Sequence, residues 1–354
     1  MSLLENTINA IEPQDVPSRA AARSRLEQLT MPYWALGRLM DLAEDLAGMT
    51  RSQHPPVSRK TVVTMAADHG VTASGVSKYP KEVTAQMVLN FVHGGAGINA
   101  LAKLSGARVV VVDMGVETEL EGLAKEGKII SKRIAPGTQN MATGPAMSVD
   151  QARRSVEAGI EVALALGDST DLFGTGEMGI GNTTPSSAIV SVLTGCDIEK
   201  ATGRGTGIDD AQFDHKVSVL REALRVNQPD PADALDVLSK IGGFEIGGIA
   251  GLILGAASLK KPILIDGFIS TAGALIAQAL CPVSTQYMIS AHRSVEQGHQ
   301  AALKHLQKHP LLDLDLRLGE GTGAALAMHH VEAAVSILTE VATFAEASVS
   351  EADK

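Results

Sequence analysis

The chain has 354 residues, of which 45% are hydrophobic and 20% charged, a composition typical of a globular protein with one large core and a smaller appendage. Its formal net charge is -10 and it contains no run of lysine or arginine, which argues against nucleic acid as a partner. Cys196 and Cys281 stand far apart and without partners at metal-ligand spacing, so neither a disulfide framework nor a zinc site is expected.

The N-terminus and the longest apolar run give no sign of a membrane protein. The N-terminal stretch MSLLENTINAIEPQD lacks a basic region followed by an apolar core, so no signal peptide is expected. The apolar run over residues 246–259 is too short and too rich in glycine to cross a bilayer, and it predicts a buried helix instead. We therefore expect a cytoplasmic protein that makes no membrane contact.

The pattern of apolar residues divides the chain into helical ends and a middle of alternating strands and helices. Residues 20–29 and 34–46 have helical spacing, and a polar connector over 51–60 follows. From Lys60 onward, short apolar strands end in loops and are followed by helices, which is typical of parallel βαβ units. Because ligands bind outside the carboxyl ends of such strands, these loops should converge. The expected strands are 61–65, 108–112, 170–173 and 262–265, which end at Asp68, Asp113, Gly174 and Asp266, and the expected helices are 95–104, 149–166, 209–226, 246–259, 295–308 and a long one from Ala324.

The stretch from Phe173 to Ser187, FGTGEMGIGNTTPSS, combines a glycine-rich turn with the start of a helix. Its glycines would let a ligand lie directly on backbone N–H groups. Thr183 or Thr184 can cap the following helix, and Pro185 suits its first turn. The stretch therefore predicts an anion site at a helix N-terminus. The glycines concerned are Gly174, Gly176, Gly179 and Gly181.

Glu177 distinguishes this stretch from a plain phosphate loop, because a carboxylate beside an anion is unfavourable unless it has a task of its own. A ribose monophosphate would supply both the phosphate and a hydroxylated group for Glu177. Two alternatives remain open: a nicotinamide dinucleotide, since Gly174-x-Gly176-x-x-Gly179 also fits that fingerprint, and a purely structural turn. Against the dinucleotide, the residues around Asp197 do not resemble the second strand that should end in an acidic residue.

Glu320 is a second carboxylate in a glycine turn, RLGEGTGAA, just before the last long helix. The flanking glycines would let a ligand approach closely. Leu316 and Leu318 could keep the carboxyl dry, which would raise its pKa toward that of a general base working near neutral pH. The alternative is that Glu320 merely caps its own helix.

Several further polar residues carry weaker signals. Lys216 and Arg204 could offer positive charge to a phosphate or carboxylate, although a lone lysine is usually solvated. The segment SAHRS, residues 290–294, could complete a phosphate site before a helix. Tyr79 and Gln86 could shape a slot for a flat heterocycle, or could belong to an ordinary surface loop. The histidine pairs near the C-terminus lack the companions of a zinc ligand set, so no metal is expected.

The chain resembles the nicotinate-nucleotide:dimethylbenzimidazole phosphoribosyltransferases of cobalamin biosynthesis in an ordered set of strings: AADHGV, YP…QM, GGAGINALA, DMGV, FGTGEMGIGNTTPSSA, GRGTG, IDGFIS, SAHRS and RLGEGTGAALA. The match runs from the N-terminal helices to the last one. The resemblance implies transfer of the phosphoribosyl group of nicotinate mononucleotide to a benzimidazole nitrogen, with release of nicotinate and α-ribazole 5'-phosphate. It also implies a homodimer that acts on small molecules and uses neither a metal nor another cofactor.

The same resemblance implies an α/β fold with a three-layer Rossmann-like parallel sheet over residues 59–309. It also implies a small helical domain built from both chain ends, residues 1–58 and 310–354. Lys78 departs from the family pattern, which has a small hydroxyl residue there, and this bears on the base accepted rather than on the reaction. By motif position, the resemblance makes Glu320 the general base and makes Glu177 and Lys216 polar active-site residues. It places three residues near the phosphate: Gly179, Gly267 and Ser294. It places three around the accepted heterocycle, Tyr79, Gln86 and Met178, and the substrate-binding set is completed by Gly176, Gly181, Asn182 and Leu318.

Two alternative functions stay open from the sequence. A binding or regulatory protein could hold a nucleotide without reacting it, although two glutamates in two glycine turns count against that. A related transferase could prefer another benzimidazole, a purine or a phenol. The sequence does not choose among acceptors, because that selectivity depends on the shape of the pocket.

Overall fold

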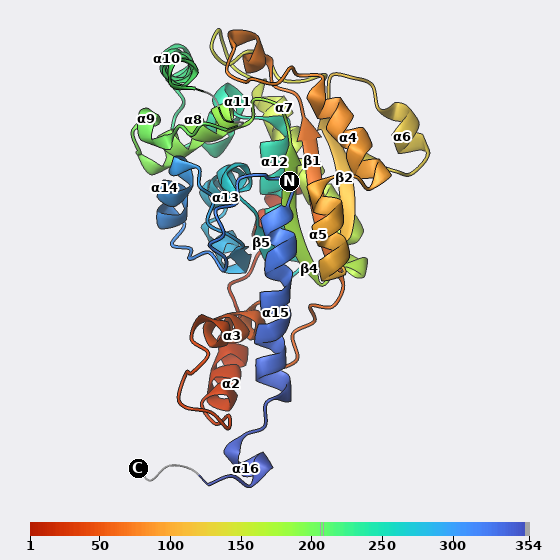
Figure 1. Ribbon diagram of the computed structural model, residues 1–354, viewed down its shortest axis with the longest axis vertical. Coiled ribbons are helices and arrows are strands. Elements are labelled where there is room, and N and C mark those ends of the chain that lie inside the picture. The colour runs from red at the N-terminus through yellow and green to blue at the C-terminus, as the bar shows by residue number, and fades with distance from the viewer. Residues whose placement is uncertain (206, 208, 351–354) are drawn as a thin grey trace.

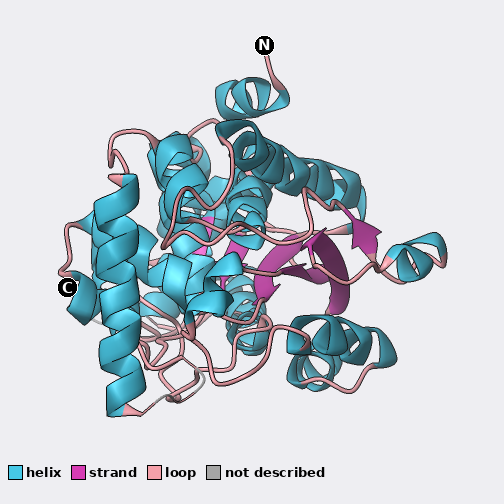
Figure 2. Ribbon diagram, turned by 90° about the horizontal axis from the view of Figure 1, so that it is seen from above, coloured by secondary structure: helices cyan, strands magenta, loops and turns pink. Residues whose placement is uncertain are grey.

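A computed structural model describes residues 1–205, 207 and 209–350, and its centre is a six-stranded parallel sheet (Figures 1 and 2). The strand order is β3-β2-β1-β4-β5-β6, so the winding direction reverses between β1 and β4. At such a switch point the loops after the two central strands diverge and leave a crevice for a ligand. The predicted α/β class is confirmed. The strands are β1 Lys60–Ala67, β2 Arg108–Gly115, β3 Ile130–Ser131, β4 Leu172–Met178, β5 Ile263–Ile265 and β6 Met288–Ser290.

Helices cover both faces of the sheet. On one face α7, α12 and α13 pack together, and α12 lies against the central strands, with Met65 and Met114 beneath it. On the other face α5 packs on β2, α4 packs on β1, β2 and β4, and the first turns of α15 pack on β1, β4 and β5 (Figure 1). The helices are α1 Leu3–Ala10, α2 Val16–Leu26, α3 Arg38–Thr50, α4 Val83–His93, α5 Gly97–Ser105, α6 Glu121–Lys125, α7 Val149–Leu166, α8 Thr183–Thr194, α9 Ile198–Ala201, α10 Asp210–Asn227, α11 Ala234–Ile241, α12 Phe244–Ser258, α13 Phe268–Leu280, α14 Gln297–His305, α15 Thr322–Glu340 and α16 Phe344–Ala347, with short 3₁₀ helices at Gly70–Ser74, Gly167–Ser169 and Pro282–Tyr287.

Helix α12 is the buried helix expected over residues 246–259. It is apolar except for Glu245 in its first turn and Ser258 at its end, and all but this last residue are buried. Its glycines let α7 approach closely: a Cβ added at Gly159 of α7 would lie 1.9 Å from the carbonyl oxygen of Gly248. Small residues at a helix crossing thus set the tight packing of this layer on the sheet.

Strand β4 is longer than the sequence indicated. The expected strand ended at Phe173, with Gly174 and Gly176 in a loop, and this boundary is wrong because β4 continues to Met178. Pairing with β1 runs from Leu172 to Met178, so neighbouring strands supply the backbone hydrogen bonds that the glycines would not favour by propensity alone. The turn that remains is residues 179–182. The short strands β3 and β6 and the helix α1 were not expected either.

Helices α2 and α3, from near the N-terminus, meet the C-terminal segment at one end of the molecule (Figure 1). There α2 and α3 pack with α15, and Leu29 forms an antiparallel bridge with Thr343. Helix α1 instead packs on α7, where the Leu4 N–H donates to the Glu157 carboxylate at 3.2 Å. That residues 1–58 and 310–354 form a domain of their own stays a prediction, and residues 351–354 of it lie outside the described part of the chain.

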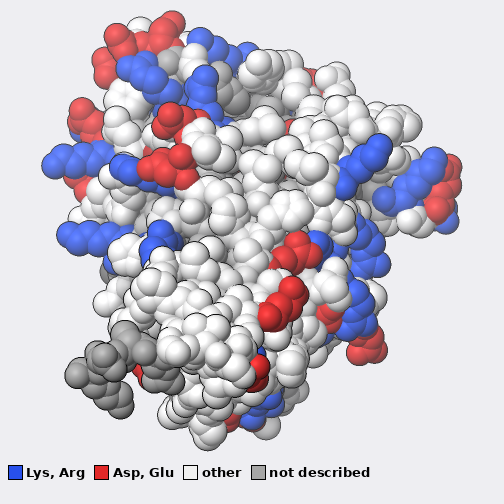
Figure 3. Space-filling model, turned by 60° about the horizontal axis from the view of Figure 1, so that its bottom comes forward, with Lys and Arg blue, Asp and Glu red and all other residues white. Residues whose placement is uncertain are grey.

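Within residues 1–205, 207 and 209–350, no helix is long and apolar enough to cross a membrane. Figure 3 shows a face on which acidic and basic side chains lie interspersed around a mostly uncharged centre.

Candidate active site

The candidate site lies at the carboxyl edge of the sheet, where β1, β4, β5 and β6 end. Asp68 follows β1, and Glu177 is the second-last residue of β4. Asp266 follows β5, and His292 comes soon after β6. All four side chains are buried. The chain thus gathers several ionisable groups in a region of low dielectric beside the switch point, where pKa values are easily shifted.

Glu177 is 6% exposed, and its carboxylate Oε2 accepts a hydrogen bond from Asn182 Nδ2 at 2.5 Å. Burial raises the pKa of Glu177 to about 8; the negative charges of Asp266 and Glu245 add to this rise, and the Asn182 amide opposes it. The carboxyl is therefore largely protonated at neutral pH and can act as a hydrogen-bond donor as well as an acceptor.

Glu320 stands in a tight turn directly against Glu177. A Cβ added at Gly319 would lie 2.1 Å from Glu177 Oε1, and one added at Gly176 would lie 2.3 Å from the Glu320 carbonyl oxygen. The Glu320 side chain is 6% exposed, and its Oε2 accepts the Ile98 N–H at 3.0 Å, at the start of α5. Burial raises the pKa of Glu320, and the bond from Ile98 opposes the rise.

The alternative that Glu320 caps its own helix does not hold. The N-cap of α15 is Gly321, and the Glu320 carboxylate binds α5 instead.

Lys216 reaches from α10 to the N-terminus of α8. Its side chain is 1% exposed, and its ammonium donates to Thr183 Oγ1 at 2.8 Å and to the Gly203 carbonyl at 3.3 Å. Burial lowers the pKa of Lys216 to about 8, against the attraction of the Glu296 carboxylate. A buried ammonium beside a helix N-terminus favours an anion there, because the charge of the lysine and the positive end of the helix dipole add.

Of the residues expected near the phosphate, Gly179 lies just before the start of α8, whereas Gly267 follows β5 and Ser294 follows β6. Gly179 and Gly181 form the turn before α8, with Gly181 at a φ of 88°, and Asn182 is the N-cap residue of α8, although its side chain bonds Glu177 and makes no cap hydrogen bond. Gly267 is the N-cap of α13. Ser294 is buried, and its backbone N–H donates to His299 Nδ1 at 2.9 Å. Of the GRGTG string, Thr206 lies outside the described residues.

The residues expected around the base are more open. Tyr79 is 53% and Leu318 61% exposed, Gln86 is also exposed on α4, and Met178 is half-buried at the end of β4. Lys78 donates a hydrogen bond to the Gly207 carbonyl, so its ammonium ties two loops together. These positions place the expected acceptor pocket at the outer rim of the carboxyl edge.

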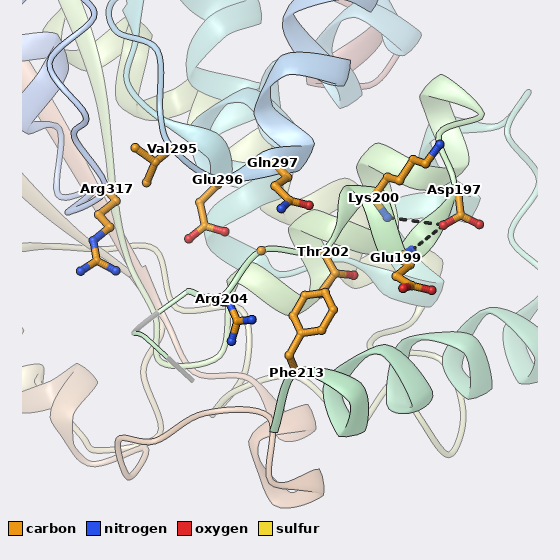
Figure 4. Close-up of a pocket in the computed structure, with 11 residues that line it drawn as sticks. Asp197, Glu199, Lys200, Thr202, Arg204, Phe213, Val295, Glu296, Gln297 and Arg317 are labelled. Carbon is orange, nitrogen blue, oxygen red and sulfur yellow. Dashed lines mark hydrogen bonds between the residues drawn. The ribbon is translucent and has the colours of Figure 1, made fainter. Parts of the chain in front are cut away.

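Two cavities open at this edge. One of about 630 Å³ is lined by α9, the segment 202–204, residues 295–297 and Arg317 (Figure 4). Here Glu296 Oε2 is buried without a hydrogen-bond partner. The second, of about 580 Å³, runs from Asp68 and His69 to the loop that carries Tyr79. Neither cavity is lined by Glu177 or Glu320, whose carboxyls lie deeper.

Sequence reasoning missed a buried His–Glu pair in the site and the contacts of one aspartate. His69 Nε2 lies 2.6 Å from Glu245 Oε1, both fully buried, and this pair supports the turn at Gly179. Asp266 was named only as a strand end, yet its carboxylate binds the start of α15. An acidic or imidazole side chain at the end of an apolar strand was the available signal. No group of three or more potential metal ligands occurs among the described residues.

Polar groups at the switch point of a parallel sheet, with a buried lysine at a helix N-terminus, form the kind of arrangement in which α/β enzymes hold nucleotides. The family model described as "Phosphoribosyltransferase" matches residues 11–349, so the chain belongs to this family.

Relatives and a solved structure narrow the family further, and they confirm the resemblance seen in the sequence. The nicotinate-nucleotide–dimethylbenzimidazole phosphoribosyltransferase of Syntrophotalea carbinolica is 64% identical over 351 residues, with 99% of each chain covered. The protein of the same name from Desulfotalea psychrophila is 55% identical over 355 residues, with 100% of each covered. The crystal structure of CobT from Thermus thermophilus superimposes with a TM-score of 0.91 at 43% identity, covering 95% of this chain and 100% of that one.

Proposed function

We propose that this chain transfers the phosphoribosyl group of nicotinate mononucleotide to 5,6-dimethylbenzimidazole or a similar base. The products are nicotinate and α-ribazole 5'-phosphate, which serves in assembly of the cobalamin nucleotide loop. The observation that carries the proposal is the buried Glu177 carboxyl, which lies against the turn that carries the buried Glu320, together with the buried Lys216, which bonds Thr183 at the start of α8. The names of relatives up to 64% identical over the whole chain support it.

In the proposed reaction the lone pair of a benzimidazole nitrogen forms a bond to ribose C1′ from the face opposite nicotinate. The C1′–nicotinate bond breaks with its electron pair moving to the leaving ring, so configuration inverts from β to α. The attacking ring becomes cationic and its other N–H acidic. Glu320 takes that proton, and its raised pKa suits a base that works near neutral pH. Holding both rings on one ribose supplies much of the remaining rate.

The other residues position the substrates. Lys216 and the N-terminus of α8, with the turn at Gly179, take the 5'-phosphate, while Gly267 and Ser294 close that site. Glu177, with its pKa of about 8, hydrogen-bonds the ribose or the nicotinate carboxylate. The base lies among residues at the rim: Tyr79, Gln86, Met178 and Leu318.

The setting of the enzyme is part of the same proposal. We infer a homodimer in the cytoplasm that acts on small molecules without a metal and without nucleic acid. The net charge of -10 supports the last point, since a nucleic-acid surface is usually basic.

The test is an assay of the purified protein with nicotinate mononucleotide and 5,6-dimethylbenzimidazole, in which nicotinate and ribazole phosphate are followed by chromatography. Glu320→Gln should bind nicotinate mononucleotide normally and lose about a hundredfold or more in turnover, because the proton then has no nearby acceptor. Glu340→Gln, at the exposed far end of α15, is the matched control and should be fully active.

Three outcomes would contradict parts of this proposal. Equal turnover by Glu320→Gln would remove Glu320 from the mechanism. Product with adenine or a phenol, and none with the benzimidazole, would change the acceptor. Saturable binding of the nucleotide without nicotinate release, whatever the acceptor, would make the protein a binding protein.

A further inference from the structure

The backbone that carries Glu320 has an unusual conformation. Gly319, Glu320 and Gly321 have φ angles of 85°, 64° and 98°, so three consecutive residues are left-handed. The glycines adopt this region freely, but a residue with a Cβ disfavours it. Glu320 therefore keeps its orientation only if contacts outside the turn hold the backbone there.

Asp266 supplies the main contact of this kind. Its Oδ2 accepts the Gly321 N–H at 3.2 Å and its Oδ1 accepts the Ala324 N–H at 3.0 Å. Since Gly321 is the N-cap of α15 and has no side chain, the carboxylate of Asp266 caps the helix from a different part of the chain. Thr64 Oγ1 adds a bond to the Glu320 carbonyl at 2.9 Å.

Asp266 is itself held firmly. Its backbone N–H donates to Thr175 Oγ1 at 3.0 Å, which locks the end of β5 to β4, and the side chain is almost fully buried. The carboxylate thus joins two strands of the sheet to the start of α15. A rigid support of this type is what a reacting group needs to stay within a fraction of an ångström of its working position.

Asp266 also acts through its charge. The groups facing it are Glu177 from β4, Glu320 from the turn, and His292 from beyond β6, whose Nε2 lies 3.7 Å from Asp266 Oδ1, with the His299 ring behind at a centroid distance of 6.2 Å. Burial raises the pKa of Asp266, while His292 and the N–H groups at the start of α15 favour its charged form. Burial also raises the pKa of both glutamates, and the negative charge of Asp266 adds to the rise in each. Loss of that charge should therefore lower both pKa values.

We propose that Asp266 is a positioning residue for Glu320: its carboxylate holds the left-handed turn of residues 319–321 and so presents the Glu320 carboxyl to the incoming base. This inference rests on the proposed function. It goes further by assigning to Asp266 a task that is exerted only through Glu320.

The test is a double-mutant cycle of Asp266→Asn with Glu320→Gln. Asparagine keeps the size of the side chain but loses the charge and one acceptor, so kcat should fall about 10- to 100-fold with KM for the nucleotide nearly unchanged. In the Glu320→Gln background the same change should cost less than about twofold, because the group that it positions is already gone. The acid limb of the pH profile of kcat should also move to lower pH.

Asp113→Asn is the matched control. Asp113 follows β2 as Asp266 follows β5, is buried, and accepts the backbone N–H groups of Gly115 and Val116 at 3.0 and 2.9 Å. Asp113→Asn should lose about as much stability as Asp266→Asn but should keep the wild-type pH profile of kcat. If Asp266→Asn shows no cooperative unfolding transition, Asp266→Ser, whose hydroxyl can still accept one N–H, goes through the same cycle.

An equal loss of kcat in both backgrounds, or no loss in either, would overturn the proposal. An Asp266 variant that loses activity without a shift of the acid limb of the pH profile would overturn the claim that the charge of Asp266 raises the pKa of Glu320. Failure of the proposed function is recognised separately, since the wild type would then release no nicotinate in the same assay.

Discussion

Lys216 should make nucleotide binding sensitive to pH between 7 and 9. Its pKa of about 8 means that about nine-tenths of the ammonium is present at pH 7 and about one-tenth at pH 9. A phosphate that needs the charged form should therefore bind about tenfold more weakly at pH 9. The ligand phosphate does not contribute, because its second pKa is about 6 and it is a dianion throughout.

The assay is isothermal titration of nicotinate mononucleotide into the protein at pH 7, 8 and 9. Lys216→Met removes a charge-assisted hydrogen bond of about 1.5–3 kcal/mol, so affinity at pH 7 should fall about 10- to 100-fold. Glu177 titrates in the same pH range, and the pH dependence of affinity that remains in Lys216→Met is the part due to Glu177. The ratio of association constants at pH 7 and pH 9 should thus be about tenfold larger in the wild type than in the variant.

Lys200→Met is the control, because Lys200 is an exposed cation at the nearby cavity of Figure 4. It should keep the pH dependence of the wild type. The same ratio in the wild type and in Lys216→Met would refute the assignment of Lys216 to the phosphate.

Two further predictions concern close packing and buried charge. Gly176→Ala would place a methyl group 2.3 Å from the Glu320 carbonyl oxygen, so it should displace the turn, cost about 1–3 kcal/mol in urea unfolding and abolish most turnover. His69→Ala would leave Glu245 buried and unpaired, and should cost about 3–5 kcal/mol at pH 6. Although burial opposes it, Glu245 raises the pKa of His69, so this stabilisation is complete below the unfolded-state pKa of 6.5 and is lost as pH rises through the folded value.

Each of these variants has a control in α6. Gly122→Ala adds a Cβ with nothing within 4 Å, so stability should stay the same or rise by up to about 1 kcal/mol. Lys125→Ala removes an exposed ion pair with Glu121, which should cost less than about 1 kcal/mol. Equal unfolding free energies for a variant and its control would contradict the packing or charge argument behind that variant.

The alternation of strands and helices was predictable because it rests on local signals. The apolar runs that end at Asp68 and Asp113 lie in β1 and β2, and the run that ends at Asp266 begins one residue before β5. The 3.6-residue period over 149–166 corresponds to α7 to the residue. Parallel pairing and ligand binding at the carboxyl edge then follow from general rules of such sheets. The long strings around Glu177 and Glu320 were specific enough to indicate the family, as the matches confirmed.

The extent of β4 and the fine structure of the site were not predictable in this way. Gly174 and Gly176 look like turn residues, yet they lie in a strand because β1 pairs beside them and α15 packs where their side chains would be. The catalytic and binding roles of Glu320, Glu177 and Lys216 stay predictions for the assays above.

The sequence by itself determined the class of fold, the order along the chain of strands β1, β2, β4 and β5, and the family, because these depend on local periodicity and on contiguous strings. Only the tertiary structure decided that the Glu320 carboxylate binds the start of α5, that His69 pairs with Glu245, and that Asp266 caps α15. The partners in these contacts lie between 55 and 222 residues apart, so they meet only once the chain has folded around its sheet. The left-handed turn at Glu320 persists for the same reason, since distant side chains outweigh its local preference.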